Sequence, residues 1–446
     1  MSILRRVAAV GIFAVACTLS LGCGHAHLQP ATAEGRSEMA RLAKAVADGT
    51  ADANAPLALR EAGPEGLAAL LLELDAAPTD AARVARLRPA IDQVAKQKDA
   101  HVSRLYWYTD LDQAQAVAHE TSRPILSLRL LGNLDDELSC ANSRFFRTTL
   151  YSNVDVATYL RDHFVLHWSS ERPAPVMTID FRDGRKIQRT ITGNSIHYVL
   201  DEAGRPLDAI PGLYGPAAFV TALAKVVDLD QRTHKMSASD RDAAVAMYHT
   251  AELTRLTAQW RSMLAGAGVT DPALFALPAP PPPGNVPAAT IAAPLAYAKA
   301  AVEMPMVRAV MPSMELPDDK LPWSRITATY AGTAKLDASA RALVRAKNPM
   351  DWSNQDGPRP LDDAAFDALI ASFEKLMVED GTRNEFKNHA KLHEWLLASP
   401  DMSWKDLDKR VYSELFLTPK SDPWLGLVPP GVYSGIENDG IVSPPK

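Results

Sequence analysis

The side chain best suited to chemistry in this sequence is the thiol of Cys140. The chain has 3 cysteines, and the other two, Cys17 and Cys23, lie in the amino-terminal segment, where an export signal is predicted below. Cys140 then stands alone, so no internal disulfide and no cysteine-rich metal site is expected. A lone thiolate can capture a partner as a mixed disulfide, isomerise a disulfide or be oxidised to sulfenic acid. The alternative is a buried, unreactive cysteine, because free cysteine is among the most buried residue types.

Ser143 follows three residues after Cys140 and limits what this thiol can do. In a Cys-x-x-Cys pair the second thiol releases the captured partner, and a serine hydroxyl cannot replace it in that step. The pattern therefore predicts monothiol work at Cys140 rather than efficient dithiol reduction. A protein partner, held by a mixed disulfide, is the kind of partner that this chemistry implies.

A second candidate is a helix face that carries Glu385, His389 and His393. Their spacing of four residues places the three side chains on one side of a helix predicted over residues 383–397. Two imidazoles one turn apart can bind zinc, with a carboxylate as the third ligand. The zinc-hydrolase motif His-Glu-x-x-His is absent, because Ala390 follows His389. The alternative is a polar helix face beside apolar neighbours.

The amino terminus predicts export. A short basic start precedes an apolar run over residues 7–21, which is typical of a secretion signal and too short for a comfortable membrane span. A glycine and Cys23 follow, which resembles the signal box of bacterial lipoproteins, in which the cysteine is acylated. Cleavage there leaves a lipid on Cys23. The alternative is ordinary cleavage after Ala26, which gives a soluble protein without Cys23.

Localisation and partners follow from this signal and from composition. A lipid on Cys23 anchors the protein in a membrane of the cell envelope, and Gly24 is compatible with the outer membrane of a Gram-negative cell, facing the periplasm or the surface. The 446-residue chain is 47% hydrophobic, with a net charge of -6 and no basic run, so nucleic acid is not an expected partner. No cofactor is predicted, since no phosphate loop, nucleophile elbow or haem motif occurs.

The middle of the chain alternates between strand and helix patterns. Strands are predicted over residues 105–108, 124–130, 164–168, 176–181, 186–192 and 196–200, and helices over residues 111–121, 154–162 and 217–227. The sequence Arg182-Asp183-Gly184-Arg185 between two of these strands is a hairpin signal. Such alternation predicts an α/β domain with a mixed sheet flanked by helices.

The order of these elements resembles the thioredoxin-like fold over residues 103–230. Residues 110–121 look like the first helix of secreted thioredoxin-like proteins, ahead of the strand Arg123-Pro124-Ile125-Leu126-Ser127-Leu128. Ser139-Cys140-Ala141-Asn142-Ser143 sits where that fold carries its active loop and helix start. Tyr198-Val199-Leu200-Asp201, followed by Pro211-Gly212-Leu213-Tyr214, looks like the final hairpin.

The resemblance implies roles for four residues. Cys140 would lie at a helix amino end, where backbone N–H groups and the helix dipole stabilise a thiolate. Ser143 would lie one turn along, within hydrogen-bonding reach of the sulfur. Ser195 occupies the loop in which the family carries a cis-proline and would face Cys140, and a nearby His197 would make a Cys–His nucleophile. The chain departs from the family pattern in having Cys-x-x-Ser and no proline at this place.

The whole chain divides into seven predicted regions. They are a signal peptide (1–22), a spacer after the lipid anchor (23–36), a helical region (37–102), the thioredoxin-like domain (103–230), a helical extension (231–276), a Pro-rich linker (277–290) and a mostly α-helical carboxyl-terminal domain (291–446). Gly63-Pro64 is predicted to break a helix of the amino-terminal region. The carboxyl-terminal helices are predicted over residues 337–346, 362–377, 383–397 and 404–416.

Three hypotheses about function follow. The first is a lipid-anchored envelope protein with a degenerate thioredoxin-like domain, whose Cys140 performs monothiol redox work or partner capture beside Ser143; as an enzyme it would be thiol-disulfide oxidoreductase-like. The second is a non-redox binding or scaffold lipoprotein that uses the fold only as a platform, with the helical carboxyl half as its partner-binding module. The third is a metal-dependent activity at Glu385, His389 and His393.

Overall fold

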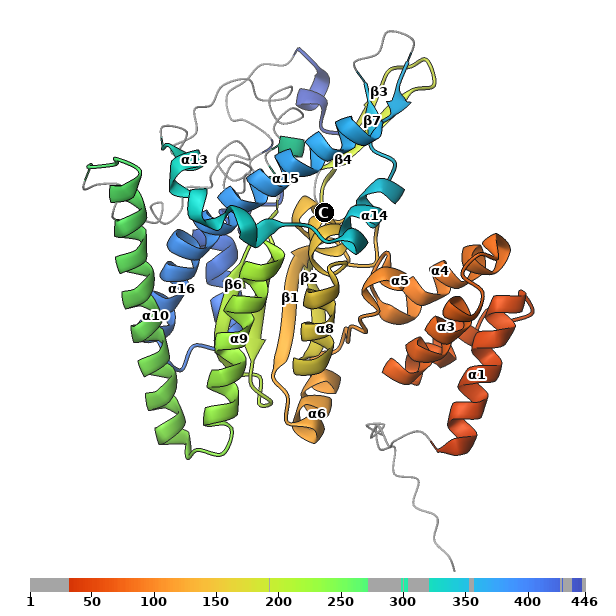
Figure 1. Ribbon diagram of the computed structural model, residues 1–446, viewed down its shortest axis with the longest axis horizontal. Coiled ribbons are helices and arrows are strands. Elements are labelled where there is room, and N and C mark those ends of the chain that lie inside the picture. The colour runs from red at the N-terminus through yellow and green to blue at the C-terminus, as the bar shows by residue number, and fades with distance from the viewer. Residues whose placement is uncertain are drawn as a thin grey trace, which may run out of the picture.

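The computed structural model describes residues 32–191, 193–271, 298–299, 301–303, 321–352, 357–425, 427 and 435–442 (Figure 1). The predicted signal peptide, Cys23 and the Pro-rich linker lie outside these residues. Within them, no helix has the length and apolar character needed to cross a membrane.

The amino-terminal region is a small helical bundle with its own core. Its helices are α1 (Ala33–Asp48), α2 (Ala55–Glu61), α3 (Pro64–Ala76), α4 (Ala81–Ala95) and α5 (Ala100–Ser103). The predicted break is confirmed: Gly63 has a φ of 72°, and Pro64 opens α3, where a missing N–H costs nothing. Arg60 donates to the carbonyl oxygens of Val94 (2.8 Å) and Trp107 (2.7 Å), which ties the bundle to the chain that enters the sheet.

The centre of the molecule is a mixed sheet of four strands in the order β2-β1-β5-β6. The strands are β1 (Ile125–Leu131), β2 (Val165–Arg172), β5 (Ile196–Leu200) and β6 (Pro206–Pro211). β1 and β2 are parallel and joined by a helical crossover, whereas β5 pairs antiparallel with β1, and β6 antiparallel with β5. The residues of β1, β5 and β6 are almost all buried, so both faces of the sheet are covered. The prediction of a mixed sheet flanked by helices is confirmed.

Different parts of the chain cover the two faces of this sheet. The helices nearest to it in sequence are α6 (Leu111–Thr121), α7 (Ala141–Phe145), the π-helix η1 (Phe146–Leu150), α8 (Val154–His163) and α9 (Pro216–Thr233). Successive residues of a strand point to opposite faces. In β5, His197 packs on Phe146 and Phe219, whereas Tyr198 donates to Asp408 Oδ1 (3.0 Å) in the carboxyl-terminal region. Figure 1 shows α8 and α9 in front of the sheet.

One predicted strand segment and the predicted hairpin lie outside the four-stranded sheet. Residues 105–108 form one isolated bridge, Tyr108 with His167, instead of a strand. The reason is that neighbouring N–H groups bond in different directions: Trp107 donates to Ala95 of α4, and Tyr108 donates to Leu166 of β2. The predicted hairpin is confirmed: β3 (Val176–Asp180) and β4 (Lys186–Thr190) pair with each other and form a separate two-stranded sheet.

The carboxyl-terminal region shares its core with the sheet. Its described elements are α10 (Ala238–Gly266), α13 (Trp323–Ile326), the 3₁₀-helix η4 (Ala328–Ala334), α14 (Ala338–Ala346), β7 (Met350–Asp351), β8 (Arg359–Pro360), α15 (Asp363–Arg383), the π-helix η5 (Asn384–His389), α16 (Ala390–Ala398), α17 (Trp404–Arg410), the π-helix η6 (Val411–Leu415) and the 3₁₀-helix η7 (Glu437–Gly440). Buried side chains such as Leu392, Trp395 and Tyr412 belong to the same cluster as the strands of the sheet.

The helix predicted over residues 383–397 contains a π-helical turn. α15 runs into η5 and then into α16 without leaving the helical conformation. A π turn holds more residues than an α turn, so side chains four residues apart do not keep the alignment that a regular helix gives them. Such turns occur often at functional sites.

Candidate functional site

Cys140 lies at the carboxyl end of β1, where the chain turns into a helix. It is the residue that precedes α7, and its own N–H donates to Leu131 O at 3.1 Å. α7 continues directly into η1, so the helical segment spans residues 141–150. The position at a helix amino end is the one that the resemblance implied. The side chain, however, is fully buried, as the alternative interpretation expected.

The loop before β5 meets Cys140. Sγ of Cys140 lies 3.2 Å from Oγ of Ser195, within hydrogen-bonding distance for a sulfur atom. Ser195 is itself fully buried. The two residues predicted to face one another therefore do so, although they are separated by the whole of β2 and the β3–β4 hairpin in sequence.

Ser143 and His197 have other partners than the sulfur. Ser143 Oγ lies 2.6 Å from Ser139 Oγ and 2.9 Å from the carbonyl oxygen of Cys140. The expected Ser143–sulfur hydrogen bond is thus replaced by contacts inside the turn. His197 Nε2 lies 2.6 Å from the hydroxyl of Tyr151, and burial lowers the pKa of His197 to about 3. No hydrogen bond joins Cys140 to His197: Sγ faces Ser195, Nε2 faces Tyr151, and Nδ1 of His197 has no hydrogen-bond partner among the described residues.

Residues from the carboxyl-terminal half cover the loop that carries Ser195. Lys299, which is fully buried, donates from Nζ to Gly193 O (3.0 Å) and to Asn194 Oδ1 (3.1 Å). Tyr412 donates its hydroxyl proton to Asn194 O at 3.0 Å. Segments more than a hundred residues away in sequence therefore hold this loop in place over Cys140.

The second predicted site comes together with a different carboxylate. His389 and His393 stack with their ring centroids 4.3 Å apart. The carboxylate between them is Asp208 of β6, whose Oδ1 lies 2.9 Å from His389 Nε2 and 4.0 Å from His393 Nδ1. Glu385 stands behind His389, with Oε2 3.4 Å from Nδ1. Among the described residues, Asp208, His389 and His393 form the group whose side-chain atoms are close enough to share a metal ion.

Two further residues complete this buried cluster. Tyr248 of α10 donates its hydroxyl proton to Asp208 Oδ2 at 2.6 Å. His249, the next residue, places Nδ1 2.8 Å from Nδ1 of His393. Among the described residues, Nε2 of His249 and Nε2 of His393 have no hydrogen-bond partner.

Strong electrostatic coupling links the charged members of the cluster. Burial alone would lower the pKa of His389, but Asp208 and Glu385 outweigh it and raise that pKa to about 10. Burial alone would raise the pKa of Glu385, but His389 and Arg255 lower it to about 2. Burial likewise opposes ionisation of Asp208, yet His389 and His393 hold its pKa below the usual range. Burial lowers the pKa of His393 well below that of a free imidazole.

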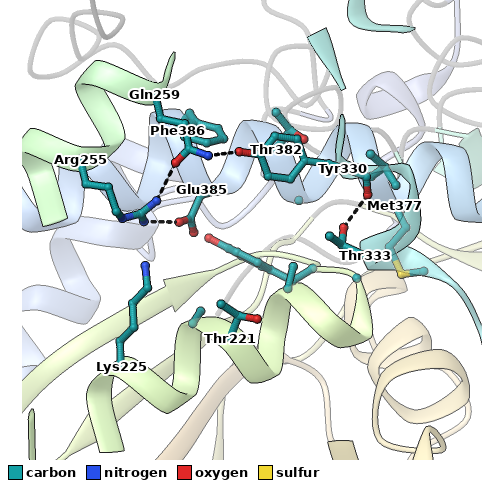
Figure 2. A pocket seen from close by; sticks show the side chains of 16 residues that line it. Thr221, Lys225, Arg255, Gln259, Tyr330, Thr333, Met377, Thr382, Glu385 and Phe386 are labelled. Atoms are coloured by element: carbon teal, nitrogen blue, oxygen red, sulfur yellow. Dashed lines mark hydrogen bonds and ion pairs between the residues drawn. The ribbon is translucent and has the colours of Figure 1, made fainter. Parts of the chain in front are cut away.

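Glu385 also lines a cavity of about 220 Å³ (Figure 2). Residues of α9, α10, η4, α15 and η5 line it. Figure 2 shows Arg255 directed at Glu385, to which it donates at 2.8 Å, and Arg255 also donates to Glu252 at 2.8 Å. Lys225, a further lining residue, donates to the same Glu252 carboxylate at 2.8 Å. Both cations thus have carboxylate partners, so the cavity has no excess positive charge for an anion.

Comparisons of this chain with protein-family models, with curated proteins and with solved structures found no match.

Sequence reasoning missed Asp208 and His249. Asp208 lies in the short strand Pro206–Pro211, where an acidic residue between apolar neighbours was the available signal. A charged side chain is almost never fully buried without a partner. His249 lies on the long helix α10 and carried no such signal, because its environment depends on helices more than a hundred residues later in the chain.

Proposed function

We propose that this protein is an exported, lipid-anchored envelope protein in which a thioredoxin-like domain serves as a platform for the helical carboxyl half. In this proposal Cys140 performs no thiol chemistry. The observation that carries the absence of thiol chemistry is the complete burial of Cys140 against Ser195, under a loop held by Lys299 and Tyr412.

Topology supports the thioredoxin-like part of the proposal. The sheet order β2-β1-β5-β6, with a helical crossover between two parallel strands and an antiparallel hairpin after them, agrees with the order of elements on which the resemblance rests. Cys140 stands at the start of the first helix after β1, and Ser195 stands just before β5. These are the two places at which the family carries its active cysteine and its cis-proline.

Accessibility supports the absence of thiol chemistry. Disulfide exchange needs an in-line approach of a second sulfur, and oxidation needs an approaching oxidant, so both depend on an exposed thiolate. Cys140 has no exposed surface, and no second cysteine lies among the described residues. A fold can be kept as a structural platform when its active residues are changed.

Thiol alkylation tests the platform proposal. In the mature chain with Cys23→Ala, Cys140 is the only cysteine, so labelling by iodoacetamide reports on that thiol alone. We expect alkylation of the folded protein to be at least roughly 100-fold slower than in urea, because it must wait for local opening. The unfolded chain is the control that the reagent is competent.

Fast alkylation of the folded protein, with a rate near that of the unfolded chain, contradicts the platform proposal. It would favour the second candidate, monothiol capture at Cys140, for which the 3.2 Å contact with Ser195 at a helix amino end is the supporting observation. Under that candidate, a disulfide-linked envelope partner is recovered with the wild type and is absent with Cys140→Ser.

A further inference from the structure

One cluster of side chains has no part in the platform function. Asp208, His249, His389 and His393 meet at the edge of the sheet, and all four are buried. They come from three separate elements: β6, α10, and the η5–α16 helix with its π turn. Three imidazoles and a carboxylate are an unusual content for a protein interior, because polar groups lose their hydration there.

The spacing of the donor atoms suits a small cation. Asp208 Oδ1 lies 2.9 Å from His389 Nε2 and 4.0 Å from His393 Nδ1, and His393 Nδ1 lies 2.8 Å from His249 Nδ1. Zinc–ligand bonds of about 2.0–2.1 Å in a tetrahedron place two ligands about 3.3 Å apart. The donor atoms of Asp208, His389 and His393 all lie within 4.8 Å of one another, so small shifts bring them to a common ion. His249 lies outside that group and reaches the ion by a larger movement of its side chain, which now contacts His393.

We propose that Asp208, His389 and His393 bind a zinc ion, with His249 as the fourth ligand. Imidazole nitrogen and carboxylate oxygen are ligands that zinc accepts, and four protein ligands make a closed site. This set differs from the sequence-based hypothesis in its carboxylate, which is Asp208 in place of Glu385.

The surroundings of the four residues resemble the groups that orient the ligands of a zinc site. A histidine that binds zinc usually donates its other N–H to a carboxylate, and here Glu385 Oε2 lies 3.4 Å from Nδ1 of His389. A carboxylate that binds zinc is usually hydrogen-bonded in turn, and Tyr248 donates to Asp208 Oδ2. The facing atoms, His389 Nε2 and Asp208 Oδ1, lie 2.9 Å apart, and the Ala209 N–H also donates to Oδ1 at 2.7 Å, so zinc would replace the proton between the imidazole and the carboxylate.

Burial assigns this zinc a structural role. Asp208 and His393 are fully buried, and none of the four proposed ligands lines the neighbouring cavity, which Glu385 borders. A catalytic zinc keeps a position open for water or substrate, whereas a structural zinc is enclosed by protein ligands. Zinc at this place would crosslink α10 and the η5–α16 helix to strand β6.

Metal analysis of the full mature chain, purified without a histidine tag, tests the proposal. Zinc content is measured on the protein as isolated, and Co²⁺ is then titrated into protein that has been dialysed against a chelator. We expect one metal ion per chain and the visible absorption of tetrahedral cobalt. We also expect a Tm at least about 3 °C higher with zinc than with chelator, because zinc binds the folded chain.

Two sets of variants locate the bound ion. The double variant His389→Gln/His393→Gln is expected to lose the cobalt absorption and the zinc-dependent shift in Tm. Two control variants remove histidines outside the cluster. One is His25→Ala/His27→Ala near the amino terminus, and the other is His101→Gln. These controls are expected to bind one cobalt ion with the wild-type spectrum.

Cobalt uptake by the wild-type chain tests the zinc proposal even if the double variant does not fold. A chain that takes up no cobalt at the one-to-one level, or whose bound cobalt is lost with His25 and His27, overturns the proposal. The cluster would then be a metal-free network in which His389 bridges Asp208 and Glu385. The alkylation test of Cys140 does not depend on either result.

Discussion

His197 is fully buried between Phe146 and Phe219, with Nε2 against the hydroxyl of Tyr151. Burial lowers its pKa to about 3, so the folded protein keeps this imidazole neutral down to strongly acidic pH. The unfolded chain, in contrast, protonates the same group near pH 6.5. Between these two values the unfolded state binds the extra proton, and acid therefore favours unfolding.

The free energy of unfolding is expected to fall as the pH drops below about 6.5. One additional proton on the unfolded chain amounts to about 1.4 kcal/mol per pH unit, so His197 alone accounts for roughly 2 kcal/mol between pH 6.5 and pH 5. His197→Gln, which cannot be protonated, should remove this part of the slope. Urea unfolding followed by circular dichroism at several pH values measures it.

The opposite result would contradict this account of the pH dependence. If His197→Gln keeps the wild-type slope, the neutral state assigned to the buried imidazole is wrong.

The candidate-site residues divide into those that local sequence could predict and those that it could not. Cys140 and Ser195 come together because the order of strands and helices places the end of β1 beside the start of β5. The hydroxyl of Ser143 was expected at the sulfur but is turned to Ser139, a choice made by side-chain packing inside one turn. Asp208 was missed because its partners are contributed by helices far along the chain.

At the scale of elements, the crossing of α2 and α3 depends on one glycine. A Cβ added to Gly66 would lie 1.9 Å from the carbonyl oxygen of Leu59, which is backbone and cannot rotate away. Gly66→Ala is therefore expected to destabilise the protein by about 2 kcal/mol or more, although alanine is the better helix former. Chemical denaturation of the full mature chain gives this difference in the free energy of unfolding.

Gly266, the last residue of α10, is the matched control. A Cβ added there has no heavy atom within 4 Å among its surroundings. Gly266→Ala is expected to be neutral or to stabilise the protein by up to about 1 kcal/mol. Equal effects of the two substitutions would show that the close contact between α2 and α3 is not what constrains Gly66.

Element types were easier to predict than their pairing and fine geometry. The strands of the sheet and helices such as α9 and α10 followed from apolar periodicity, because that pattern is local. The isolated bridge at Tyr108 was predicted as a strand, since periodicity does not reveal where N–H groups find their acceptors. The π turn at Asn384–His389 was also missed, because it is set by packing against β6 and α10 rather than by any residue type.

At the scale of the whole molecule, the proposed lipid on Cys23 would decide where the protein resides. In a bacterial host, the wild type is expected to incorporate radiolabelled palmitate and to sediment with membranes. Cys23→Ala should lose the label, because acylation requires the cysteine thiol. Cys17→Ala, which changes a cysteine inside the predicted signal, should keep it.

Mass spectrometry of the mature amino terminus detects the outcome that would contradict a lipid anchor. A soluble, unlabelled wild-type protein that begins after Ala26 would establish ordinary cleavage and contradict the anchor. The predicted thiol count is the same in either case, since Cys140 remains.

The core shared by the sheet and the carboxyl-terminal helices has a consequence for how this chain can vary. Arg129 and Tyr198, on the sheet, both bond to Asp408, which lies 210 residues after Tyr198. A gene fragment that encoded residues 103–230 alone would leave Arg129 without this carboxylate and would expose a sheet face now covered. The central domain is therefore not a module that recombination can move freely between proteins. The sheet and the carboxyl-terminal helices of this protein must therefore be inherited together. Substitutions at Asp408 must also be compatible with Arg129 and Tyr198, its partners on the sheet.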